Sequence, residues 1–269
     1  MQQVNLLNRQ SRKLVASTFL ASWIPWFTLA AIDIEEKTSH WLYIVGGIGP
    51  VIGFLICFFH DKRMGYVWKN PFTVSKSPLF FISLLPLVSF VPVLLSGLIG
   101  SLSLQIPFDE KGWNASVSEY GGYFLFALVI FIGGPLTEEL SWHGYLWPRL
   151  AILHGMKRSV AIAGSVWTMW HLPLFFIQGT SQNSNWTKGG FIIFFAISCY
   201  LQMWLWGLFY EISGFGVYSA IFAHYFLNLS SFIVLFDWRL RTIEMTLYLL
   251  MIAFLYKLNQ GRMVKKSAD

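Results

Sequence analysis

Eight long apolar runs, separated by short polar segments, constrain this chain more than any other feature. They cover residues 14–32, 41–59, 78–104, 120–147, 160–177, 189–210, 217–236 and 245–256. A helix needs about 20 apolar residues to cross the hydrocarbon core of a bilayer. The pattern therefore predicts an all-α, polytopic membrane helix bundle of about eight transmembrane helices, built as a single integral membrane domain over residues 1–269.

The composition supports this prediction and indicates the partners. Only 12% of the residues are charged and 55% are hydrophobic, whereas a soluble domain carries about twice that charged fraction. With eight spans and an inner N-terminus, 14 of the 19 Lys and Arg residues lie on the inner side. The positive-inside rule then predicts a multi-pass protein of the cell membrane with both termini cytoplasmic. The net charge of +6 is explained by topology, so the lipid bilayer is an expected partner and nucleic acid is not.

Polar side chains interrupt three of the apolar runs. They are Glu138, Glu139 and His143 in the fourth run, Trp167 and His171 in the fifth, and His224 and Asn228 in the seventh. Helical residues four apart share a face, so each run presents its polar groups together. Counted at about 1.5 Å per residue from the inner loops, Glu139, His171 and His224 lie at about 15, 20 and 12 Å. Similar depths on three spans predict one shared site in the inner half of the bundle.

These residue types suit the activation of water against an amide carbonyl. A carboxylate in a low-dielectric pocket is a usable general base. An imidazole can share the water, ligate a metal or donate to an oxyanion, and the amide of Asn228 can donate to the same oxyanion. Ionisable groups at membrane depth are by default a functional hypothesis.

A structural explanation exists for each residue taken singly. A lone intramembrane histidine is often a hydrogen-bonding group between packed helices. One glutamate of the pair can be neutralised by Arg149 or Arg158 at the inner interface, and Trp167 can serve packing alone. The functional hypothesis therefore depends on the three clusters acting together.

Taken in order, the three clusters resemble the CPBP family, the CAAX proteases and bacteriocin-processing enzymes also called the Abi group. The family motifs are a Glu-Glu pair followed after three residues by Arg, then Phe-x-x-x-His, then His-x-x-x-Asn. The resemblance covers residues 133–231, within a motif-bearing catalytic core expected at 120–231. Two positions depart from the pattern, because His143 stands where the motif has Arg and Trp167 where it has Phe.

The resemblance implies a role for each matching residue. Glu138 with His171 would activate water, His224 and Asn228 would stabilise the oxyanion, and Glu139 would support the site. His143 and Trp167 are supporting residues, and histidine, unlike arginine, is not a permanent cation. The family is described as metalloproteases, which makes Glu138, His171 and His224 candidate ligands for zinc or another divalent metal; water activation without a metal is the alternative.

The resulting function is an intramembrane endopeptidase that cleaves a peptide or a prenylated protein near the cytoplasmic membrane face. One alternative is a non-proteolytic relative that acts in bacteriocin immunity or as a peptide-binding scaffold, which the His143 departure favours. A second alternative is a proton-coupled transporter, although the sequence lacks the repeated halves typical of that class.

Overall fold

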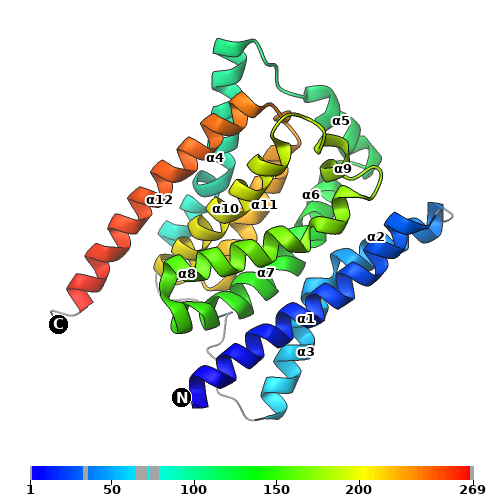
Figure 1. The fold of residues 1–269 in the computed structure, drawn as a ribbon. Helices are drawn as coiled ribbons and strands as arrows, with labels where there is room; N and C mark the ends of the chain where they lie inside the picture. Colours follow the sequence, from blue (N-terminus) through cyan, green and yellow to red (C-terminus); the bar gives the residue numbers. More distant parts are fainter. Residues whose placement is uncertain (1, 33–35, 65–71, 73–78, 267–269) are drawn as a thin grey trace. The chain divides into compact units, whose positions relative to one another are not determined.

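The computed structural model describes residues 2–32, 36–64, 72 and 79–266, and every regular element in that part of the chain is helical (Figure 1). The α-helices are α1 (Gln2–Ala31), α2 (Glu36–Gly47), α3 (Gly49–Arg63), α4 (Leu79–Leu104), α5 (Glu110–Glu119), α6 (Tyr123–Phe131), α7 (Thr137–Ser141), α8 (Trp147–Trp170), α9 (Ser181–Asn185), α10 (Phe191–Ser213), α11 (Val217–Ser231) and α12 (Trp238–Lys266). Two π-helical turns, η1 (Ile132–Leu136) and η2 (Trp142–Leu146), flank α7, and a 3₁₀ turn, η3 (Leu172–Phe175), follows α8.

Each predicted apolar run coincides with helical chain, with two differences in detail. The second run is broken between α2 and α3, which meet at 46°, because Pro50 in the first turn of α3 has no N–H to continue the preceding helix. The helix of the eighth run is also longer than the run, because α12 already begins at Trp238. Between the fourth and fifth runs, the helical path of α8 is interrupted at Gly155, where φ is 69°.

Several helices are suited to the membrane. Among the described residues, Val4–Ala31, Tyr123–Trp170 and Phe191–Ser213 are long and apolar enough to cross a bilayer, and the bent pair of α2 and α3 adds a fourth if it forms one span. The polytopic membrane helix fold is thereby confirmed. The number of about eight spans stays a prediction, because three or four are found among the described residues.

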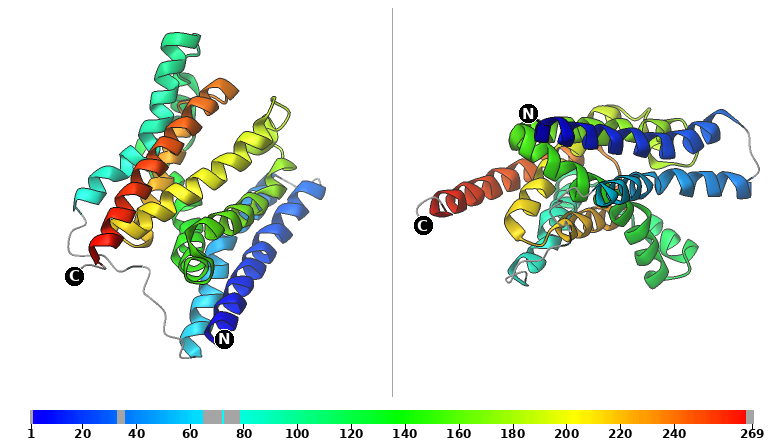
Figure 2. Two further views of the ribbon diagram at one scale, coloured as in Figure 1. Left: turned by 60° about the vertical axis from the view of Figure 1, so that its left-hand side comes forward. Right: turned by 90° about the horizontal axis from the view of Figure 1, so that it is seen from below.

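The chain divides into two compact units. The first contains Met1–Pro71 and Ile132–Tyr200, and its α1 and α3 lie side by side (Figures 1 and 2). Gly49 and Gly53 of α3 permit this approach, because an added Cβ would lie 2.9 Å from the backbone N of Ser22 and 3.0 Å from that of Thr18. Small residues four apart are typical of close helix contacts in membranes.

The second unit contains Phe72–Phe131 and Leu201–Asp269. Its α4 and α12 lie side by side (Figure 2), and α11 also packs on α4. Ser89 of α4 joins the unit together: its hydroxyl accepts a hydrogen bond from Trp206 Nε1 at 3.0 Å, and its carbonyl accepts one from Tyr248 at 3.4 Å. This buried serine thus hydrogen-bonds α4 to α10 and α12.

Candidate active site

The two adjacent glutamates lie on α7, between the π-helical turns. Pro135 in η1 cannot donate to the helical ladder, and the chain around it forms this wider turn. π-Helical turns are often found at functional sites. Glu138 is 6% exposed and Glu139 is fully buried, so both carboxyl groups need hydrogen-bonding partners within the protein.

Two tryptophans hold the carboxylate of Glu138. The indole Nε1 of Trp167 donates to Oε2 at 2.6 Å, and that of Trp142 approaches the same oxygen at 3.4 Å. The sequence offered Trp167 chiefly as a packing residue and gave no role to Trp142. Sequence spacing could have indicated Trp142, which lies four residues after Glu138 and therefore on its face of the helix.

His171 ends α8 and is oriented by the same tryptophan. Its Nδ1 lies 2.8 Å from the carbonyl oxygen of Trp167. Because a carbonyl only accepts, Nδ1 carries a proton, and in the neutral imidazole Nε2 then has the free lone pair. The rings of Trp170 and Phe195 pack edge-on against the imidazole at 4.8 and 5.1 Å. Trp167 thus contacts Glu138 through its indole and His171 through its backbone carbonyl. The two predicted catalytic residues of this unit therefore share one hydrogen-bonding neighbour.

Glu139 is paired with His143, as their spacing predicts. Nδ1 of His143 and Oε2 of Glu139 form a hydrogen bond one helical turn apart, and both side chains are fully buried. The residue that departs from the family motif therefore occupies the expected position next to the second glutamate.

Arg149 pairs with a carboxylate outside the glutamate pair. Its Nη2 donates to Asp61 of α3 at 3.1 Å, its Nε to Gln10 of α1 at 3.1 Å, and its Nη1 to the carbonyl of Tyr145 at 2.9 Å. The hydroxyl of Tyr145 donates to Asp61 at 2.6 Å. Arg149 and Asp61 are each 3% exposed, so a buried ion pair joins α8 to α3.

His224 and Asn228 belong to the second unit. Both lie on α11, one turn apart. His224 is 4% exposed and stacks on Trp206 with ring centroids 4.9 Å apart, while Asn228 is half-buried. The two residues share one face of α11, as the predicted motif requires. That they form a site with Glu138 and His171 stays a prediction.

The candidate metal ligands come from both units. Glu138 and His171 lie in the first unit, and His224 lies in the second. Catalytic zinc sites use three protein ligands, and across residues 2–32, 36–64, 72 and 79–266 no group of three His, Cys, Asp or Glu side chains is arranged to hold a metal ion. The candidate set Glu138, His171 and His224 stays a prediction.

Comparison with known proteins bears on the family resemblance. Residues 120–230 match the family model described as type II CAAX prenyl endopeptidase Rce1-like. CAAX prenyl protease 2 of Methanococcus maripaludis is 27% identical over 176 residues, which are 62% of this chain and 63% of that relative. The chain thus spans less than two thirds of the length of the relative. Both matches support the resemblance that the three motifs indicate: residues 120–230 of this membrane protein, which contain all three motifs, are similar to the Rce1-like CAAX prenyl endopeptidases.

Proposed function

We propose that this chain is an intramembrane endopeptidase in which Glu138 and His171 activate the attacking water. The observation that carries the proposal is Trp167, which hydrogen-bonds the buried carboxylate of Glu138 and the Nδ1–H of His171. Two groups able to accept a proton are thereby fixed from one residue. General-base sites require a further group that orients the base, and Trp167 orients both Glu138 and His171.

In the proposed reaction, one water donates to the Glu138 carboxylate and to Nε2 of His171. Glu138 takes the first proton while the water oxygen forms a bond to the scissile carbonyl carbon, and the carbonyl electron pair moves to its oxygen. Glu138 then protonates the amide nitrogen as the C–N bond breaks. His171 takes the remaining proton when the acid product ionises. General acid–base catalysis of this kind contributes about 10²- to 10⁴-fold.

The oxyanion formed in this step needs donors. By the family resemblance, His224 and Asn228 supply them, and removal of one such donor typically costs about 10²- to 10³-fold in kcat. Glu139 with His143 supports the helix that carries Glu138. Their buried contact favours retention of activity despite the missing motif arginine.

The proposed substrate is a peptide or a prenylated protein cut near the cytoplasmic membrane face. The relative from Methanococcus maripaludis is named for prenyl substrates, and the matched family is described in the same terms. We extend that substrate class to this chain as part of the proposal, with the termini cytoplasmic as the charge distribution predicts.

The test is cleavage by the purified full chain of a farnesylated peptide ending in a CAAX sequence, beside its unprenylated counterpart. Glu138→Gln and His171→Asn should each lower kcat by at least about 100-fold. Glu110→Gln, an exposed carboxylate on α5, is the matched control and should retain activity. Circular dichroism must show unchanged helicity in all three variants. Full activity of Glu138→Gln would contradict the proposal; tight peptide binding without cleavage by wild type would instead indicate a non-proteolytic relative.

A further inference from the structure

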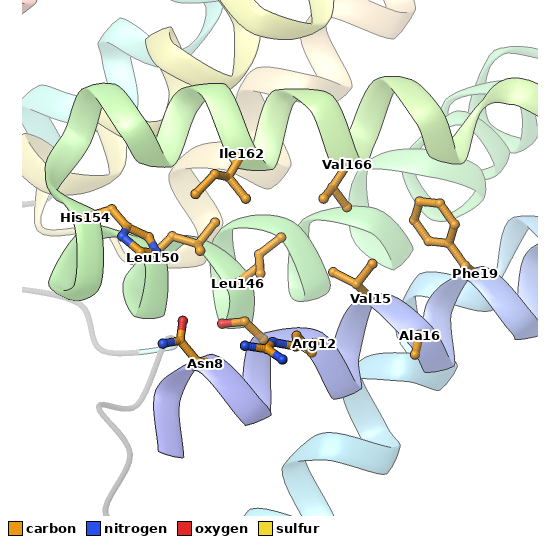
Figure 3. A pocket seen from close by; sticks show the side chains of 11 residues that line it. Asn8, Arg12, Val15, Ala16, Phe19, Leu146, Leu150, His154, Ile162 and Val166 are labelled. Atoms are coloured by element: carbon orange, nitrogen blue, oxygen red, sulfur yellow. The ribbon is translucent and has the colours of Figure 1, made fainter. Parts of the chain in front are cut away.

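A groove in the first unit lies apart from the glutamates. It encloses about 470 Å³, within the range of about 300–1,000 Å³ typical of small-molecule sites. Figure 3 shows that it runs along α1 and is faced by both helical parts of α8. Its apolar lining consists of Val15, Phe19, Leu146, Leu150, Ile162 and Val166.

One end of the groove is polar and basic. Arg12 and Asn8 of α1 lie there, with His154 of α8 near the same end (Figure 3). Arg12 is exposed, and none of the ion pairs found in the described chain includes it. A guanidinium with neighbouring donors is suited to a phosphate group.

Ser11 supplies independent evidence for a ligand. It lines the groove and is 7% exposed, yet its hydroxyl has no hydrogen-bond partner among the described residues. Ser17 on the same helix bonds the carbonyl of Lys13. A buried hydroxyl without a partner destabilises the folded protein, and a ligand oxygen at this position would supply the missing hydrogen bond.

We propose that this groove binds one anionic phospholipid, with its phosphate at Ser11 and Arg12 and an acyl chain along the apolar wall. Asn8 and Phe19 are eleven residues apart, or about 16 Å along a helix. This equals about half of the 30 Å hydrocarbon core, the depth of one leaflet. Basic pockets between transmembrane helices are known to take anionic headgroups. The binding is independent of the proposed peptidase activity.

The experiment is native mass spectrometry of the purified full chain titrated with phosphatidylglycerol or phosphatidylcholine of identical acyl chains. Wild type should bind one phosphatidylglycerol at least tenfold more tightly than phosphatidylcholine. Arg12→Gln should weaken phosphatidylglycerol binding about tenfold, and Ser11→Ala should weaken it about threefold. Ala16→Trp, which fills the groove from α1, should abolish binding of both lipids. Arg9→Gln is the matched control, because Arg9 is exposed on the same helix and does not line the groove.

Each other outcome overturns the proposal. Equal effects of Arg12→Gln and Arg9→Gln would mean general attraction of anionic lipid rather than a site. Equal affinity for the two lipids would mean an apolar groove without headgroup recognition. Displacement by glycerol 3-phosphate at the same concentration would identify a soluble anion, and tighter binding of farnesylcysteine would identify an isoprenoid. Melting curves establish that each variant is folded. If Arg12→Gln is not folded, Ser11→Ala tests the headgroup contact in its place.

Discussion

The buried ion pair of Arg149 and Asp61 gives the sharpest prediction about stability. Arg149→Met removes three hydrogen bonds, to Asp61, Gln10 and the carbonyl of Tyr145. It leaves the Asp61 carboxylate, 3% exposed, with the Tyr145 hydroxyl and a 3.4 Å contact to His60 Nδ1, but without the guanidinium. Removal of one partner from a buried pair destabilises by about 3–5 kcal/mol. At about 2–4 °C per kcal/mol, the melting temperature should fall by roughly 6 °C or more.

The assay is thermal unfolding in detergent, followed by tryptophan fluorescence. Arg239→Gln is the control, because Arg239 pairs with Asp237 at an exposed position and should change the melting temperature little. Adding Asp61→Asn to Arg149→Met removes the uncompensated charge and should recover part of the loss. The reasoning is refuted if Arg149→Met lowers the melting temperature no further than the control, or if the two substitutions are fully additive.

Three further predictions concern the site and its support. Trp167→Phe keeps the ring but removes a charge-assisted hydrogen bond worth about 1.5–3 kcal/mol, so kcat should fall about 10- to 100-fold with little change in KM; an unchanged kcat would mean that Trp142 alone orients Glu138. His143→Arg should preserve or raise peptidase activity, because arginine restores the family pair with Glu139, and total loss in a folded variant would assign His143 a role of its own. Gly155→Ala should destabilise by about 1–3 kcal/mol in thermal unfolding, because φ is 69° there while nothing lies within 4 Å of the added Cβ; an unchanged melting temperature would contradict the strain.

Local spacing predicted much of this protein correctly. The apolar runs located the helices, and the four-residue spacing of Glu139 and His143 predicted their contact. Pro135 accounts for the irregular helix before Glu138, because a proline cannot donate to the helical ladder. These features depend on residues within one or two turns of each other, and helix geometry alone relates such residues.

Contacts between distant segments could not be predicted in the same way. Asp61 lies in a basic segment after an apolar run, and nothing in its neighbourhood indicates a partner 88 residues away. Trp167 and Glu138 are separated by 29 residues, and an indole in an apolar run is compatible with simple packing. The Gly49 and Gly53 pair did carry a signal, because small residues four apart are typical of close helix packing.

The two π-helical turns have a consequence for how this segment tolerates change. Each contains one residue more than the α-helical turn that would replace it, because its hydrogen bonds span five residues rather than four. Deletion of a single residue from Trp142–Leu146 would restore an ordinary turn. A five-residue π turn and a four-residue α turn both advance the helix by roughly one turn, so the downstream helix would keep its rotation, with Arg149 still toward Asp61 and Trp167 still toward Glu138. Removal of a residue from the α-helical part of α8 would instead rotate the helix beyond it by about 100°. This segment should therefore tolerate a one-residue change in length at its π-helical turns better than within its α-helices.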